Sequence, residues 1–157
     1  MKKLLICFMC VFCSCTTQAA SKLQLVELCF TAANSVEKDC LPHKFEVSLA
    51  VTEKQQTKGL MFVRDSDLSE HQGMLFVFPN EAHRVFWMRN TYVSLDIIYI
   101  DADKNVVSLV ENAATLSDTP LPSMFPAKYV VEIRGGLAKK IGITRGAKAV
   151  FELPITE

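Results

Sequence analysis

The stretch from residue 59 to residue 96 holds the densest group of side chains that could build a binding site. It contains the chain's single tryptophan, Trp87, followed closely by Arg89 and Asn90, with Asp96 where the next strand would return. Small-ligand pockets are commonly built from an aromatic wall and a few convergent polar groups. The pattern favours a pocket for a small polar or anionic ligand. The alternative is that Trp87 lies in the core and that Arg89 and Asp96 form a structural ion pair.

Signatures of common metal and catalytic sites do not occur in the sequence. Residues 101–105 (DADKN) begin like a calcium loop, but Val106 stands where a glycine is needed and Asn112 where a bidentate glutamate is needed. The three histidines lack the spacing of a zinc site. Serine-hydrolase, nucleotide and dinucleotide motifs are also missing. We therefore expect no metal and no cofactor, and a role as an enzyme is disfavoured but left open.

One catalytic hypothesis remains, in which Asp96 and Glu132 act as an acid–base pair of a hydrolase or lyase on a saccharide. Such a pair needs its carboxyl groups about 5 to 9.5 Å apart. The leading hypothesis is instead a non-catalytic binding or accessory module. A third is a structural domain that binds a protein partner through a sheet edge or through the proline-containing residues 111–127, which also form a candidate lid.

The N-terminus has the features of an export signal. Lys2 and Lys3 precede an apolar run at residues 4–12 that is too short to span a bilayer. Cleavage after Ala19 makes residues 1–19 the signal peptide. Cys15 offers a lipidation site instead, with residues 1–14 as the signal. Both routes predict export to the periplasm or cell envelope, with membrane contact only through the signal or a lipid anchor.

Two cysteines, Cys29 and Cys40, certainly remain after such processing, since the other four lie in the signal or at its edge. In an oxidising compartment they allow one pairing, a disulfide that closes a short loop. The alternative is two small buried thiols.

The element pattern predicts mainly strands. Alternation at residues 45–51 indicates a half-buried strand, and Thr52 with Gln55 forms a capping box for a helix that ends at Lys58 before Gly59. Further strands are expected at 73–78, 85–88, 95–100, 106–110, 129–133 and 149–153, with a short helix at 136–141. Residues 20–42 are poorly patterned, apart from a possible edge strand around Leu25, and are separated from a single β-rich domain at 43–157.

Length and composition agree with this organisation. The chain has 157 residues, of which 50% are hydrophobic and 22% charged, which suits one folded domain. Seventeen basic residues balance seventeen acidic ones. Without Lys2 and Lys3 the net charge is −2. No nucleic-acid partner is expected, since such partners attract basic proteins. The predicted fold is β-rich α+β: one compact domain, a partly closed β-barrel or curled mixed sheet with one or two short helices.

Four ordered blocks resemble a known family: GLMFVR at 59–64, GMLFVF at 73–78, FWMRNT at 86–91 and LDIIYID at 95–101. With YVVE at 129–132, they resemble domain of unknown function 192. The resemblance implies a compact β-rich domain, commonly exported in bacteria, of unestablished role. Ser94 and Ala147 depart from the family pattern, where proline and an acidic residue are frequent. The candidate pocket residues inside matching blocks are Arg64, Trp87, Arg89, Asn90, Thr91, Asp96 and Glu132.

Overall fold

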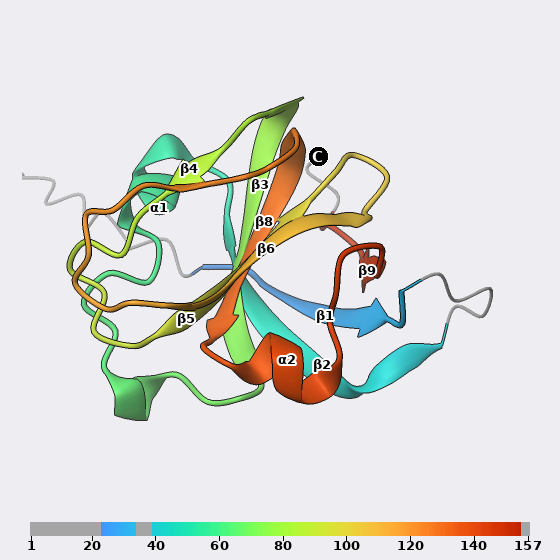
Figure 1. Ribbon diagram of the computed structural model, residues 1–157, viewed down its shortest axis with the longest axis horizontal. Helices are drawn as coiled ribbons and strands as arrows, with labels where there is room; N and C mark the ends of the chain where they lie inside the picture. The colour runs from blue at the N-terminus through green and yellow to red at the C-terminus, as the bar shows by residue number, and fades with distance from the viewer. Residues whose placement is uncertain (1–22, 34–38, 155–157) are drawn as a thin grey trace, which may run out of the picture.

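The computed structural model describes residues 23–33 and 39–154, which form a mixed seven-stranded sheet and a separate two-stranded sheet (Figure 1). The large sheet has the order β6-β5-β8-β3-β2-β1-β9, and the small one pairs β4 with β7. The strands are β1 (Leu25–Thr31), β2 (Cys40–Ala50), β3 (Gln72–Ala82), β4 (Val85–Phe86), β5 (Leu95–Ile100), β6 (Val106–Ala113), β7 (Leu121–Pro122), β8 (Ala127–Arg134) and β9 (Ala149–Phe151). The helices are α1 (Glu53–Lys58), a 3-10 turn (Asp65–Asp67) and α2 (Leu137–Ile141).

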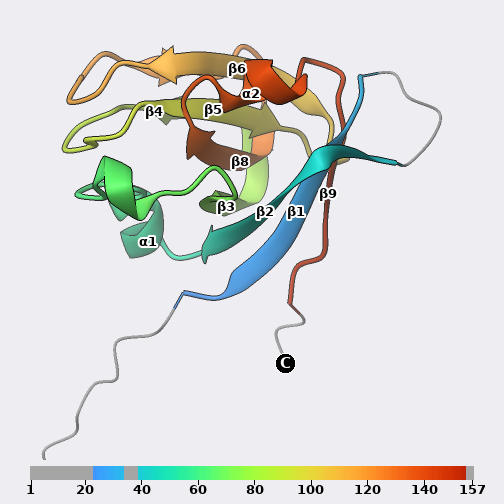
Figure 2. The same ribbon diagram turned by 90° about the horizontal axis from the view of Figure 1, so that it is seen from below.

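The large sheet curls without closing into a barrel (Figure 2). Neighbouring strands are antiparallel except β2 and β3, which run parallel. An isolated antiparallel bridge between Asn105 and Lys148 joins the start of β6 to the segment before β9. The backbone N–H of Val106 reinforces it by donating to Ala147 O at 2.8 Å. The β-rich α+β prediction is confirmed, in its curled mixed-sheet form.

Two hydrophobic clusters cover the two faces of this sheet. On β5 the side chains alternate between them: Ile98 and Ile100 belong to the cluster under α2 and β9, whereas Ile97 and Tyr99 belong to the other. Every residue of β5 is buried. The sequence LDIIYI reads as a continuous apolar run because a central strand covered on both faces needs apolar groups on both. This arrangement decides which face each polar residue of β8 reaches.

The connection from β2 into α1 forms as its sequence predicts. Thr52 Oγ1 accepts a hydrogen bond from Gln55 N at 3.3 Å, and Gln55 Oε1 accepts one from Thr52 N at 2.9 Å. This reciprocal capping box satisfies two backbone groups at the helix start. The helix ends at Gly59, whose φ of +47° favours glycine. The chain then crosses the cluster that contains Tyr99.

The weakly patterned residues before 43 contain an internal strand. β1 pairs with β2 on one side and with β9 on the other, so it is not an edge strand as predicted. Its Leu28 and Phe30 are buried in the core. The boundary drawn at residue 43 cuts through β2, which begins at Cys40. Periodicity failed here because both faces of β1 are covered near its end, which removes the alternation.

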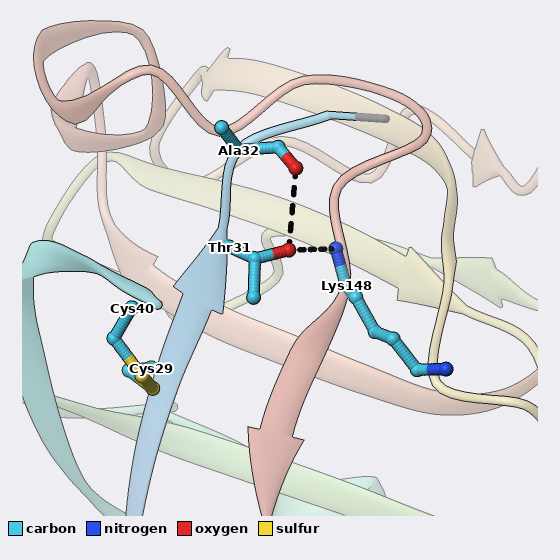
Figure 3. Close-up of a disulfide and its surroundings, with 5 residues drawn as sticks. All are labelled: Cys29, Thr31, Ala32, Cys40 and Lys148. Carbon is cyan, nitrogen blue, oxygen red and sulfur yellow. Dashed lines mark hydrogen bonds between the residues drawn. A yellow bond between two sulfur atoms is a disulfide. The ribbon is translucent and has the colours of Figure 1, made fainter. Parts of the chain in front are cut away.

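The predicted disulfide between Cys29 and Cys40 is present and links β1 to β2, with 5.8 Å between the Cα atoms (Figure 3). Beside it, Thr31 Oγ1 accepts a hydrogen bond from the backbone N–H of Lys148 at 3.3 Å. The disulfide therefore links β1 to β2 close to the point where the two ends of the sheet approach each other.

Other boundaries shift by a few residues. The strand expected at 85–88 ends at Phe86, β6 continues to Ala113, and a short strand, β7, lies inside the candidate lid at 111–127. The proposed signal and Cys15 lie outside the described residues. No helix in the described ranges is long and apolar enough to cross a membrane.

Candidate functional site

A cavity of about 250 Å³ lies between α1, β4 and the face of the large sheet that carries Tyr99. Its wall combines four aromatic side chains with aliphatic and polar ones, and the sheet contributes one carboxyl group, that of Glu132 on β8. The lining residues are Glu53, Gln56, Thr57, Lys58, Gly59, Leu60, Met61, Phe76, Phe78, Val85, Phe86, Trp87, Thr91 and Glu132. A hollow that combines aromatic rings with polar side chains has the composition of a small-ligand site.

Glu132 is the polar group at the centre of this site. It is 4% exposed and lies in register with Ile97 of β5 and Met74 of β3, both apolar. Among the described residues, its Oε2 is the buried side-chain oxygen without a hydrogen-bond partner. Burial raises the pKa of Glu132 to about 8, and a hydrogen bond from the Leu60 backbone acts weakly in the opposite direction. Buried polar atoms are nearly always partnered, so this oxygen is the group in the cavity wall best placed to accept a hydrogen bond from a ligand.

Gly59 allows the end of α1 to approach this carboxyl group. A Cβ at Gly59 would lie 3.3 Å from Phe76 Cζ and 3.6 Å from Glu132 Oε2. Its φ of +47° adds a conformational reason for glycine. A side chain here would crowd the space next to Oε2, so Gly59 helps to keep the cavity open.

Two of the lining rings, Phe76 and Phe86, pack edge to face, and Phe86 packs in the same way on Tyr99, which lies outside the lining. The Phe86 ring lies 5.0 Å from that of Phe76 and 5.9 Å from that of Tyr99, with interplanar angles of 86° and 80°. Such contacts restrict the rings. Trp87 is 45% exposed, and the Arg89 guanidinium lies 4.9 Å from its ring centroid. The inner wall is thus fixed by packing, while the rim at Trp87 is open to solvent.

Tyr99 supports the site from below. Its hydroxyl donates to Leu121 O at 2.5 Å, which ties β5 to β7. Burial, and secondarily the charge of Glu132, raise the pKa of Tyr99 well above its usual range. The phenol therefore stays neutral and its proton is already used in a hydrogen bond. It is unsuited to act as an acid on a molecule in the cavity.

Family and structural comparisons agree with this fold. A family model, DUF192, described as uncharacterized ACR, matches residues 34–151. The chain belongs to the DUF192 family. β1 precedes the matched region, so this internal strand lies outside the residues that the family model matches.

Two solved structures resemble this DUF192 protein. A protein of unknown function from Novosphingobium aromaticivorans is 38% identical with a TM-score of 0.73, and the match covers 84% of this chain and 89% of that one. A protein from Sinorhizobium meliloti, provisionally named a transcription regulator, is 29% identical with a TM-score of 0.74, over 82% and 95% of the two chains. No curated protein matches.

Three of the candidate pocket residues meet in the cavity of this DUF192 domain: Trp87, Thr91 and Glu132. Thr91 is buried, and its hydroxyl donates to Arg89 O at 3.2 Å. Of the others, Arg64 is exposed and does not line the cavity. Asn90 is exposed in a turn with φ +54°, where its carbonyl accepts a hydrogen bond from Phe62 N. Asn90 shapes the rim rather than facing a ligand.

The suggested ion pair between Arg89 and Asp96 does not form. Arg89 Nε instead contacts Asp118 Oδ1 at 2.7 Å, on the exposed surface, and this hydrogen bond raises the pKa of Arg89. Asp96 is fully buried and accepts backbone hydrogen bonds from Asn112, Gly136 and Ala138. It organises the loop that leads into α2, which is a structural role.

Asp96 and Glu132 lie on opposite faces of the sheet. Asp96 is in register with Ile133, whereas Glu132 is in register with Ile97, and neighbours on a strand point to opposite faces. No single substrate can reach both carboxyl groups. The acid–base pair postulated from the sequence is therefore not assembled in this structure.

The sequence missed Gly59 and the two inner phenylalanines, Phe76 and Phe86. All three lie in the blocks that resemble the family, but phenylalanine in an apolar run is normally core. The one local signal for the site was Gly59, directly after the capped helix. A glycine that ends a helix also lets the backbone pass close to a neighbouring strand, because it has no side chain. Which strand it approaches depends on long-range pairing that local patterns do not contain.

Unusual backbone conformations gather beside the rim. Phe62 and Leu116, both exposed, have φ of +67° and +57°. The N–H of Phe62 donates to Asn90 O at 2.8 Å and that of Leu116 to Thr91 O at 3.1 Å. Bulky residues rarely adopt this region, and such strain is enriched at functional sites. Its position beside Thr91 is a second reason to place the site here.

A larger hollow of about 590 Å³ lies between β1 and residues 150–154. Its wall includes the disulfide and the exposed side chains of Leu25 and Leu153, but the unpaired buried oxygen is in the other cavity. We assign the site to the smaller cavity at Glu132, because a buried acceptor without a partner is a stronger indication of ligand binding than a larger volume. Within residues 23–33 and 39–154, no three potential metal ligands of the His, Cys, Asp and Glu types cluster together.

Proposed function

We propose that this DUF192 domain is a non-catalytic binding module whose cavity holds a small organic ligand. An apolar part of the ligand packs among Phe76, Phe86 and Trp87, and a polar group hydrogen-bonds to Glu132. The single observation that carries this proposal is the unpartnered Glu132 Oε2, buried beside an aromatic cavity. Leaving such an oxygen unpaired costs about 1–3 kcal/mol, which a ligand donor would recover.

The cavity size favours a ligand of modest dimensions. A volume of about 250 Å³ corresponds to roughly eight water molecules at ~30 Å³ each. A ligand with about ten non-hydrogen atoms fits this space. The polar group is better described as a donor than as an anion, because Arg64 and Arg89 do not line the cavity and the basic residue that does, Lys58, is exposed, whereas the Glu132 carboxyl group is buried.

We do not propose a role in transcription for this chain, although the Sinorhizobium meliloti neighbour is named a transcription regulator. Seventeen basic residues against seventeen acidic ones provide no excess of positive charge for DNA phosphates. We also propose that the protein works after export, in the periplasm or cell envelope. The Cys29–Cys40 disulfide supports this, since disulfides persist in oxidising compartments.

A ligand screen tests the binding proposal. Trp87 is the only tryptophan and lines the cavity, so its fluorescence reports binding directly. Small amines, alcohols and acids at about millimolar concentration should reveal weak ligands, as expected for molecules of this size. Binding should also raise the melting temperature.

Two exposed aromatic residues supply a matched pair of variants. Trp87→Ala removes part of the wall. It should raise the ligand concentration needed for a given thermal shift at least about fivefold, since an aromatic contact with the ligand is worth ~1 kcal/mol or more. Tyr92→Ala removes a similarly exposed ring outside the lining and should leave binding unchanged. A complete lack of ligands, or equal effects of both variants, would contradict the proposal and favour a protein partner.

A further inference from the structure

The unpaired oxygen and the rings around it have a chemistry that selects among polar ligands. We propose that the cavity binds the ammonium group of a small primary amine, with the ionised carboxylate of Glu132 as its counter-ion. The apolar part of the amine lies among Phe76, Phe78, Phe86 and Trp87. This inference rests on the proposed function and specifies its ligand class.

An ammonium group matches both components of the site. It supplies three N–H donors, one of which can satisfy Glu132 Oε2. The negative faces of aromatic rings attract cations, most strongly in tryptophan. An anion would meet the Glu132 carboxyl group without a convergent arginine, because Arg64 is exposed and Arg89 is paired with Asp118. A neutral alcohol supplies one donor but gains nothing from the charge.

Among the residues that the structure describes, no basic side chain forms a salt bridge with Glu132. Across the cavity, α1 contributes Glu53 and Lys58, which are both exposed and oppositely charged. From β5 comes Tyr99, whose hydroxyl donates to a backbone carbonyl. Two residues along β8, Arg134 is bonded to Asp65 at 2.6 Å. The lining contributed by β3, β4 and residues 87–91 carries no charged side chain.

Binding of an amine to this site must release a proton at neutral pH. Burial raises the pKa of Glu132 to about 8, so the empty cavity holds the protonated acid. An ammonium ion entering the cavity forms an ion pair with the carboxylate, and the carboxyl proton passes to solvent. The dissociation constant of the amine should therefore fall about tenfold for each unit by which the pH rises toward about 8, and it should level off above that pH.

Three probes of equal size separate the charge states: benzylamine, benzyl alcohol and benzoate. We would titrate each into the intact protein by calorimetry at about pH 6, 7 and 8, in buffers with different protonation enthalpies. The expected result is that benzylamine binds at least about tenfold more tightly than the alcohol near pH 8, the charged hydrogen bond being worth over ~1.4 kcal/mol. Below pH 7 it should release close to one proton, whereas the alcohol should release none.

Glu132→Gln keeps the shape of the side chain and removes its charge. This variant should lose both the proton release and the preference for benzylamine, whereas Glu111→Gln, the same change at an exposed position outside the cavity, should lose neither. If Glu132→Gln does not fold, proton release by the unmodified protein still decides the question.

The possible failures are distinguishable. If benzyl alcohol or benzoate binds as tightly as benzylamine and no proton is released, the amine inference is wrong while the binding module stands. If none of the three probes, and no member of the wider screen, changes Trp87 fluorescence, the proposed function fails as well.

Discussion

Folding places the Glu132 carboxyl group where ionisation is unfavourable, and this has a consequence for stability. Its pKa is about 8 in the folded protein against 4.5 for the free group. The folded state therefore holds a proton that the unfolded state gives up between these values. The stabilising contribution is complete below about pH 4.5 and is lost as the pH rises through about 8.

The first prediction is that Glu132→Gln removes this pH dependence. The free energy of unfolding of the unmodified protein should fall by up to about 4 kcal/mol, relative to the variant, between about pH 4.5 and pH 8. Urea denaturation at several pH values measures the difference. If the difference between the two proteins stays constant across this range, Glu132 is not protonated in the folded state.

Asp96 belongs to the opposite face and to a different kind of role. Its Oδ1 accepts from Asn112 N and Gly136 N at 2.8 and 2.9 Å, and its Oδ2 accepts from Ala138 N at 2.7 Å. Asp96→Asn turns one of these oxygens into a donor facing another donor. We predict a loss of about 3 kcal/mol of unfolding free energy, since a buried unsatisfied group results.

Asp118→Asn is the matched control for that change, because Asp118 contacts only the exposed Arg89. An exposed pair of this kind contributes little to stability, because solvent screens the two charges. Both variants are compared by denaturant titration at neutral pH. If Asp96→Asn proves as mild as Asp118→Asn, the assignment of Asp96 to the support of α2 is incorrect.

At the scale of elements, the sequence predicted correctly those helix and strand features that depend on contacts between residues close together in the chain. The capping box of Thr52 and Gln55 acts over three residues, so the start of α1 was predictable. The alternation from Phe45 onward reflects one buried face of β2. By contrast, β1 is paired on both sides and Gly59 approaches Glu132 across 73 positions of sequence. These features depend on strand order, which periodicity does not encode.

The candidate site shows the same division. The aromatic wall at Trp87 was predictable because that residue type is rare and lies near other polar groups. The faces of the sheet on which Asp96 and Glu132 lie were not predictable. Alternation along one strand does not show which residues of β5 and β8 share a face until the register between the two strands is known. Their separation is what removed the catalytic alternative.

The disulfide between β1 and β2 gives a prediction about elements. Reducing the Cys29–Cys40 bond, or replacing both cysteines with alanine, should lower the free energy of unfolding by up to about 3 kcal/mol, as for a loop of this length. The sheet should survive, because β1 also pairs through a ladder from Leu25 to Thr31 and packs Phe30 in the core. Denaturant titration with and without reductant gives the loss. Circular dichroism of the reduced protein should stay native, and its collapse would show that the bond is required for folding.

At the scale of the whole molecule, the disulfide and the N-terminal pattern make one joint prediction. A chain that is exported through the apolar run at residues 4–12 should be processed and oxidised together. Expression of the full sequence in an exporting host, followed by intact-mass measurement, should give a chain starting at Ala20. Of the 157 residues, 138 would then remain, with a mass lower by two hydrogen atoms than the reduced form.

Lipid anchoring makes a different prediction for the same measurement. A chain starting at Cys15 would carry the added mass of acyl groups and sediment with membranes, and Cys15→Ser would release it. An unprocessed chain with Cys29 and Cys40 reduced would contradict export by either route. The protein would then meet its ligand in a reducing compartment. Without the disulfide, β1 would be held between β2 and β9 by strand pairing and by the buried side chains of Leu28 and Phe30. One mass spectrum, which reports processing, acylation and the state of the two cysteines, therefore distinguishes export by either route from retention in a reducing compartment.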